Sequence, residues 1–251
     1  MKLVRGLIVL AGLLALWQAV VWLTGAKPWM LPAPAAVATA WIAHRGAILS
    51  NAWLTAVEIV LGLSAGTLLG CASALIMAYF RPARRWLMPV LVVSQAIPVF
   101  ALAPLLVLWL GYGMASKVVM ATLIIYFPVT TAFHDGLRRT EPGWLDLARS
   151  MNAGRWAVLR RVRMPAALPA LASGLRVATA VAPIGAVIGE WVGSSAGLGF
   201  MMLHANARMQ VDVMFAALVT LAALAVGLYV FMDSLLRRVL PWQPDTSPAV
   251  D

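Results

Sequence analysis

The sequence predicts an all-α bundle of membrane-spanning helices, and two observations carry this prediction. Of the 251 residues, 63% are hydrophobic and only 11% are charged, whereas a soluble domain is about half apolar and a quarter charged. Apolar stretches of about 20 residues, the length at which a helix crosses a bilayer, recur along the chain. A water-soluble globule of this length could not bury so much apolar surface, so the excess is expected to face lipid.

Six stretches have the length and composition of a span: residues 7–24, 52–80, 87–110, 118–133, 168–189 and 213–236. The first could instead be a secretory signal, because Lys2 and Arg5 precede its apolar core. Bulky residues near its end, such as Trp17, favour a retained span. We therefore expect one transmembrane domain over residues 1–240, followed by a short polar tail over residues 241–251.

The basic residues indicate how the spans are oriented. If the N-terminus lies in the cytoplasm, fourteen of the 19 Lys and Arg residues fall on the cytoplasmic side, as the positive-inside rule demands. The remainder are Lys27, Arg45, Lys117 and Arg208 on the outer side and Arg176 within a span. Because an even number of spans returns the chain to its starting side, both termini are expected in the cytoplasm. The net charge of +10 is thus explained by topology, and no nucleic-acid binding is expected.

One sizeable polar segment, residues 134–165, lies between the fourth and fifth predicted spans. Its apolar residues follow the spacing of a helical face: Trp144, Leu147, Ala148 and Met151. Asn152 stands where a left-handed residue could end this helix. A second amphipathic helix follows around Trp156, and Pro165 and Pro169 are expected to stop it. Such helices either lie on a membrane surface or dock into a groove on a partner, and the pattern alone does not choose.

This segment resembles the cytoplasmic EAA loop of the permease subunits of ABC importers, written E-A-A-x3-G-x9-I-x-L-P. The matching positions are Asp146, Leu147, Ala148, Asn152, Val162, Met164 and Pro165. Asp replaces Glu, Leu replaces the first Ala, and Asn152 replaces Gly. Asn is the non-glycine residue that most readily adopts a left-handed conformation, so the turn can be kept.

The resemblance covers nearly the whole chain. The runs LPAPAAV, SQAIPVFALAPLLVLWLGYG and GAVIGEWVGSSAGLGFMM look like those of nitrate, sulfonate, taurine and thiamine-precursor permeases. Within that group the last two runs look most like permeases for hydroxymethylpyrimidine-type thiamine precursors. The resemblance implies a multi-pass permease of the bacterial inner membrane that carries a thiamine-precursor pyrimidine, with sulfonate, taurine or nitrate as alternative cargo.

The resemblance also implies partners. These are a second copy of the permease, a cytoplasmic ATPase dimer, an external solute-binding protein and the lipid bilayer. The sequence contains no Gly-x-x-x-x-Gly-Lys phosphate-binding loop, so ATP is expected on the ATPase and no cofactor on this chain. The residues that the resemblance assigns to ATPase coupling are Asp146, Leu147, Ala148, Asn152, Ala153, Gly154, Arg155 and Pro165.

Polar groups at membrane depth are costly and are usually functional. Gln95, Glu190 and Trp191 are therefore candidates for the solute pathway, and Glu58 is a further one unless it sits near the outer interface. Structural roles stay open for all of them, since Glu190 could pair with Arg208 and tryptophans commonly anchor a span at the interface. The histidines are too dispersed for a metal site.

Two rival functions remain. Residues 193–197 match the nucleophile-elbow pattern G-x-S-x-G around Ser195, with His204 and Asp212 downstream. The elbow requires a strand before the serine, and none is evident, so no enzyme is expected. A channel or secondary transporter would share the apolar composition but would need no ATPase partner.

Overall fold

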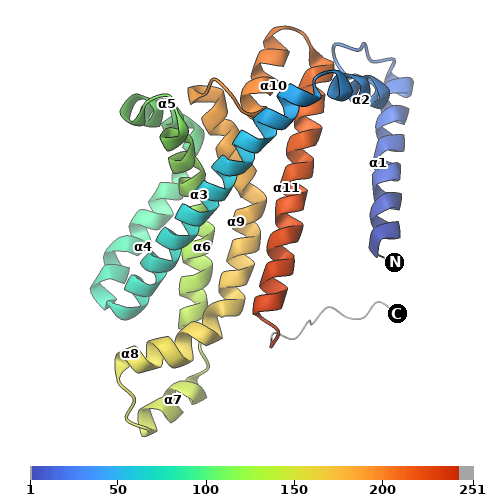
Figure 1. The fold of residues 1–251 in the computed structure, drawn as a ribbon. Helices are drawn as coiled ribbons and strands as arrows, with labels where there is room; N and C mark the ends of the chain where they lie inside the picture. Colours follow the sequence, from blue (N-terminus) through green and yellow to red (C-terminus); the bar gives the residue numbers. More distant parts are fainter. Residues whose placement is uncertain (1, 243–251) are drawn as a thin grey trace.

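The computed structural model describes residues 2–242, which are helical along most of their length and form no strand (Figure 1). The helices are α1 (Lys2–Thr24), α2 (Pro34–Ala43), α3 (Arg45–Tyr79), α4 (Arg81–Ala96), α5 (Val99–Leu110), α6 (Met114–Arg138), α7 (Pro142–Ser150), α8 (Arg155–Val158), the π-helical turn η1 (Leu159–Arg163), α9 (Met164–Gly193), α10 (Leu198–Ala207) and α11 (Val211–Val239). The all-α prediction is confirmed.

Within the described part of the chain, four helical segments are long and apolar enough to cross a membrane. They are α3, α6, the continuous helix Arg155–Gly193 and α11. The pair α4 and α5 adds a fifth candidate if it is counted as one broken span, bent by 102°. The first predicted span corresponds to a shorter apolar helix, Ile8–Thr24. The count of six spans therefore stays a prediction.

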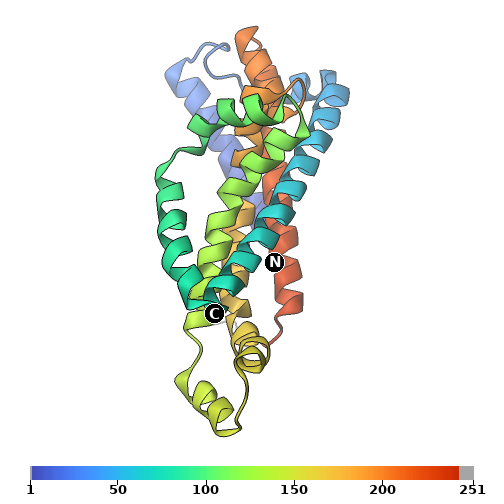
Figure 2. The same ribbon diagram turned by 90° about the vertical axis from the view of Figure 1, so that its left-hand side faces the viewer.

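The predicted third span, 87–110, is not one straight helix. Helix α4 ends at Ala96, and Pro98 is the N-cap residue of α5. The residue before a proline is disfavoured in helical conformation, and Ile97 is accordingly extended, with φ −87° and ψ 116°. The chain therefore turns sharply at this point, and α5 lies across the end of the bundle (Figure 2).

Helices α3, α6 and α9 form the centre of the bundle and enclose a core of Ile, Leu, Val and Ala side chains. Gly62, Gly66 and Gly70 lie on the face of α3 that contacts α6, and this small-xxx-small spacing lets the two helix backbones pack closely. A Cβ atom on Gly185 of α9 would lie 2.7 Å from Cα of Ala121 on α6. These helices therefore touch backbone to backbone.

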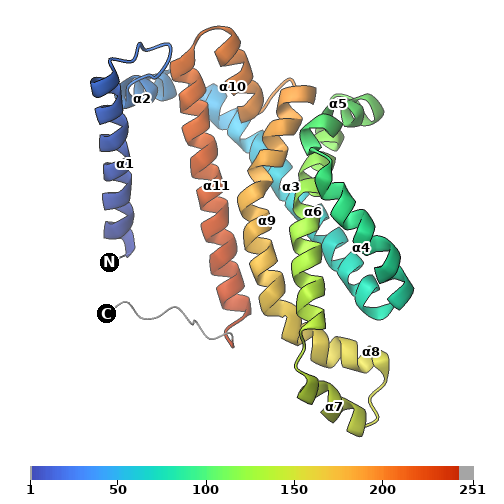
Figure 3. The ribbon, with the colours of Figure 1, turned by 180° about the vertical axis from the view of Figure 1, so that it is seen from behind.

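The remaining long helices flank this centre. Helix α11 packs against α9 and reaches α2 through a small apolar cluster that includes Val37 and Ala216. Helix α1 stands at the edge of the molecule (Figure 3), and it exposes large apolar side chains such as Leu13 and Leu16. A helix that exposes an apolar surface of this kind is suited to lipid.

One end of the molecule carries a hairpin of helices, residues 142–163, which comprises α7, α8 and η1 (Figures 1 and 2). The opposite end carries α2, α5 and α10. We call these the hairpin end and the α10 end. The prediction that Pro165 stops the second helix of the hairpin is wrong, because the helix continues from Arg155 to Gly193. The π-helical turn immediately before Pro165 accommodates a proline that would otherwise clash with an earlier carbonyl.

Candidate functional sites: the hairpin and a buried polar cluster

Helix α7 exposes both charge and apolar surface at the tip of the hairpin. Asp146 is exposed and accepts a hydrogen bond of 2.7 Å from Nη1 of Arg149, three residues later on the same helix. Leu147 and Met151 are 62% and 74% exposed, whereas Ala148 is buried. An exposed ion pair of this kind contributes little to stability. The carboxylate of Asp146 therefore contributes little to the stability of the bundle.

Asn152 forms the turn between α7 and α8 in the left-handed conformation, with φ +53°, as the sequence predicts. Its N–H bonds to the carbonyl of Arg149 at 2.9 Å, and the N–H of Ala153 bonds to the carbonyl of Ala148 at 3.0 Å. These two bonds make up a Schellman motif. Asn152 therefore occupies the left-handed position at which the EAA pattern has Gly.

The start of α8, directly after the hairpin turn, is attached to the end of α3. Nη2 of Arg155 donates a hydrogen bond of 2.8 Å to the carbonyl of Tyr79, and the same guanidinium lies 5.3 Å from the centre of the Tyr79 ring. The ring of Trp156 meets Tyr79 edge-on. Gly154, in extended conformation, is the N-cap residue of α8. The first turn of α8 is therefore fixed relative to the bundle.

The hairpin also borders an apolar groove of about 530 Å³, lined by residues that include Trp144, Leu147, Met151, Val162 and Pro165. The structure therefore brings the sequence-predicted positions from Asp146 to Arg155 together at one end of the molecule, with Pro165 beside them on α9.

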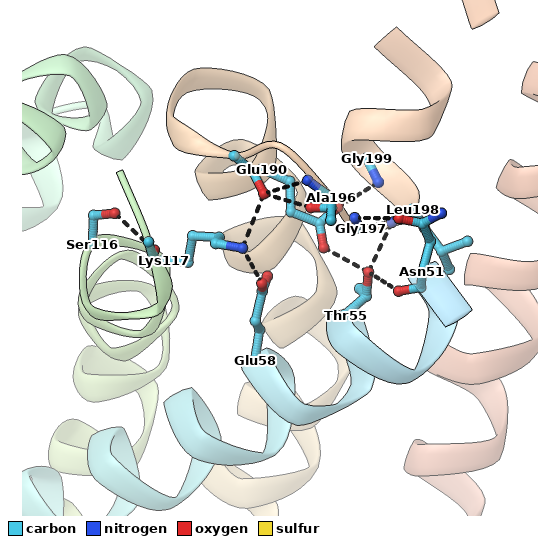
Figure 4. Close-up of polar contacts among 12 residues, drawn as sticks. Asn51, Thr55, Glu58, Ser116, Lys117, Glu190, Ala196, Gly197, Leu198 and Gly199 are labelled. Atoms are coloured by element: carbon cyan, nitrogen blue, oxygen red, sulfur yellow. Dashed lines mark hydrogen bonds and ion pairs between the residues drawn. The ribbon is translucent and has the colours of Figure 1, made fainter. Parts of the chain in front are cut away.

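At the opposite end, a buried polar cluster joins helices α3, α6, α9 and α10 and the loop between α9 and α10 (Figure 4). Glu190 on α9 is fully buried. Its carboxylate accepts a hydrogen bond of 2.5 Å from Oγ1 of Thr55 on α3 and another from the backbone N–H of Gly199 on α10. The alternative pairing of Glu190 with Arg208 is wrong, because Arg208 is an exposed residue at the end of α10.

Lys117 lies in this cluster rather than in an outer loop. Helix α6 begins at Met114, so Lys117 is within its first turn, where it is buried and forms an ion pair with Glu58. Its Nζ also donates to Oγ of Ser194 at 3.0 Å. Glu58 is fully buried. Sequence reasoning missed this site, although Glu58 within a predicted span and Glu190 directly after another do call for a buried cation.

The cluster holds the start of α10 in place. The backbone N–H of Gly197 donates to Oδ1 of Asn51 at 2.6 Å, and that of Leu198 donates to Oγ1 of Thr55 at 2.9 Å (Figure 4). Two side chains of α3 therefore satisfy N–H groups at the beginning of α10, which have no partner within that helix.

The other two pathway candidates differ in position. Trp191 follows Glu190 on α9 and is 43% exposed. Gln95 lies near the end of α4, and its side chain is outside the described residues. The structure therefore places only Glu190 in the buried cluster, and its carboxylate is already engaged there.

Comparison with known proteins identifies the family. Residues 66–242 match the family described as "binding-protein-dependent transport system inner membrane component", which is more than half of the chain. The chain belongs to this family. It is therefore a multi-pass membrane permease of the ABC importer type, and not an enzyme.

Three relatives illustrate the range of the family. A "probable ABC transporter permease protein" of Haemophilus influenzae is 54% identical over 95% of this permease and 98% of its own length. A riboflavin transport system permease of Chloroflexus aurantiacus is 39% identical over 92% of this permease and 87% of its own length. A formylaminopyrimidine transport permease of Halalkalibacterium halodurans is 32% identical over 92% of each chain.

The fold agrees with this assignment. A chain in an inward-facing structure of the MetNI methionine ABC transporter matches this permease with a TM-score of 0.68 at 19% identity, over 78% of this chain and 97% of that one. At this identity the likeness shows the fold alone. The rival hydrolase interpretation lacks the strand that a nucleophile elbow requires before Ser195, because helix α9 continues to Gly193.

Proposed function

We propose that this permease passes a small solute from an external binding protein to the cytoplasm, driven by a separate ATPase dimer that docks on the hairpin. The observation that carries the proposal is the surface of α7. The exposed Asp146 pairs with Arg149 of the same helix and lies beside exposed Leu147 and Met151. These residues lie at the tip of a hairpin that extends past the ends of the bundle helices (Figure 2). An amphipathic helix with such a face fits a groove on a partner.

The charges support a cytoplasmic hairpin end. Arginines of the α3–α4 turn, the hairpin and the last turn of α11 lie at this end, whereas Arg45 and Arg208 lie at the α10 end. The positive-inside rule favours the cytoplasm for the richer side. A second copy of the permease would complete the solute path, with Gln95 and Trp191 as the candidate lining and the buried Glu190 beside Trp191 on α9.

The cargo that we propose is a thiamine-precursor pyrimidine. Two of the three relatives described above are named for formylaminopyrimidine and riboflavin, and both molecules contain a flat pyrimidine ring. Sulfonate, taurine or nitrate is the alternative, because a taurine permease of Escherichia coli is 30% identical over 93% of this chain. Uptake of radiolabelled hydroxymethylpyrimidine into proteoliposomes, with unlabelled taurine as competitor, distinguishes the two. Competition by taurine would move the assignment to sulfonates.

Reversal of the charge at Asp146 tests the docking site. We expect Asp146→Arg to abolish most ATP-driven uptake in proteoliposomes while the ATPase still hydrolyses ATP, because the exposed pair with Arg149 contributes only about 0.3–0.5 kcal/mol to folding. The double variant Asp146→Arg/Arg149→Asp restores that local pair with its charges exchanged. If Asp146 acts only by stabilising α7, the double variant should recover uptake. If the ATPase contacts the negative charge at position 146, the double variant should not recover uptake. Undiminished uptake by Asp146→Arg would remove the coupling assignment.

A further inference from the structure

A second cavity, of about 1130 Å³, lies at the hairpin end between α3, α4, α6 and the hairpin. It is distinct from the apolar groove beside α7. Its walls are of two kinds. The apolar wall includes four residues of α4, which are Met88, Pro89, Val92 and Val93, together with residues of α3 and the hairpin. The polar wall consists of arginines from α4, α6 and the hairpin: Arg84, Arg85, Arg138, Arg149, Arg155 and Arg163.

The positive charge of this cavity is largely uncompensated. No Asp or Glu is among the lining residues. Of the six arginines, Arg149 pairs with Asp146, and Arg155 donates to the Tyr79 carbonyl. The other four have no carboxylate partner among residues 2–242. Nε of Arg163 is buried without a hydrogen-bond partner.

His134 of α6 adds a second, independent sign of a ligand. It lines the cavity, its side chain is 1% exposed, and neither ring nitrogen has a hydrogen-bond partner. The nearest acid is Asp135, whose Oδ1 lies 3.7 Å from Nδ1 of His134, beyond hydrogen-bond reach. Buried polar side chains are nearly always hydrogen-bonded. An anion in the cavity would give this imidazole an acceptor.

The combination of walls defines the chemistry of the ligand. The positive-inside rule places arginines at the cytoplasmic side of a span, but it does not gather six of them from three segments of the chain into one concavity. The planar guanidinium fork of arginine suits phosphate oxygens. The apolar wall continues along α4 toward the middle of the bundle, where only a hydrocarbon chain would gain from it.

We propose that this cavity binds an anionic phospholipid of the cytoplasmic leaflet, with its phosphate headgroup among the arginines and one acyl chain along α4. Basic pockets between membrane helices on that side are suited to such headgroups. The lipid would touch both Arg84 on α4 and Arg163 at the base of the hairpin, so it would connect the broken span to the segment on which the ATPase docks. Lipid binding in this cavity rests on the proposed cytoplasmic orientation of the hairpin end and does not depend on the cargo.

The test compares two matched double variants of the purified permease–ATPase complex. Arg84→Gln/Arg85→Gln removes two exposed arginines that line the cavity, and Arg139→Gln/Arg160→Gln removes two exposed arginines of the same end that do not line it. Both lose the same charge, and none of the four residues is buried. Phosphatidylglycerol retained after delipidation is measured by native mass spectrometry, alongside phosphatidylcholine and added inorganic phosphate.

We expect retention of phosphatidylglycerol to fall about tenfold more in the cavity variant than in its control, with weak retention of phosphatidylcholine in all forms. Equal losses in the two variants would overturn the proposal, because they would indicate general attraction of anionic lipid to a basic surface. Displacement of the lipid by millimolar inorganic phosphate would also overturn it, since the site would then take a free anion.

Discussion

Lys117 is the cation of a buried cluster that contains two carboxylates. It pairs with Glu58 and bonds to Ser194, while Glu190 is held by Thr55 and by the backbone of α10. Burial of an ion is costly, and the cost is offset only while the partner is present. The cluster therefore makes the α10 end of the bundle depend on single side chains.

Lys117→Met should destabilise the permease by about 3–5 kcal/mol, because it leaves the Glu58 carboxylate buried without its cation. The double variant Lys117→Met/Glu58→Met should recover most of this loss, since it replaces the pair by apolar side chains. Thermal unfolding of the purified protein in detergent measures both. A single variant as stable as the unaltered protein would show that the pair contributes no such constraint.

Asn152 sets the hairpin turn through its left-handed backbone. Asn152→Gly should leave the turn intact, whereas Asn152→Val should cost about 1–2 kcal/mol, because a β-branched residue is strained in this conformation. The valine variant should be cleaved faster in the hairpin by limited proteolysis and should take up less cargo. Equal cleavage rates for the valine and glycine variants would contradict the role of the turn.

At the scale of elements, the bundle is built on close contact between α6 and its neighbours. On α3, a Cβ at Gly66 would lie 2.6 Å from Cγ2 of Ile125, and on α9 a Cβ at Gly185 would meet the backbone of Ala121. Both neighbours belong to α6, which has no room to move away from both at once. The positions of α3 and α9 around α6 are therefore set by residues without side chains.

Gly185→Ala should destabilise the permease by about 1–3 kcal/mol, because its methyl group must displace the Ala121 backbone. Gly227→Ala is the matched control, since Gly227 lies in α11 with nothing within 4 Å of a new Cβ. Alanine favours a helix over glycine by about 1 kcal/mol, so the control should unfold at the same or a higher temperature. A Gly185→Ala variant that behaves like its control would mean that α6 and α9 are not in backbone contact.

Local patterns predicted the elements well where one segment determines its own structure. The apolar stretches predicted helices, and the replacement of Gly by Asn152 predicted a left-handed turn that the structure contains. Features that depend on two distant segments were not predictable in this way. The partner of Lys117 is 59 residues away on another helix. The continuation of the hairpin helix through Pro165 depends on a π-helical turn, which no sequence pattern predicted.

At the scale of the whole molecule, the two ends differ as expected for a permease that receives solute at one end and binds an ATPase at the other. The hairpin end carries most of the arginines, the exposed apolar surface of Leu147 and Met151, and a basic cavity. The α10 end carries a buried cluster that fixes the start of α10 against α3. We propose that the hairpin faces the cytoplasm, where an ATPase can reach it, and that α10 faces the opposite side.

Thiol labelling in cells measures this orientation most directly. The only native cysteine, Cys71, is replaced by alanine, and single cysteines are introduced by Ser150→Cys in the hairpin and Asn206→Cys in α10, both at exposed positions. A membrane-impermeant maleimide is added to intact spheroplasts and to opened membranes. We predict that Asn206→Cys is labelled in both preparations and Ser150→Cys only in opened membranes. Labelling of Ser150→Cys from outside intact spheroplasts would contradict the orientation and, with it, docking of a cytoplasmic ATPase on the hairpin.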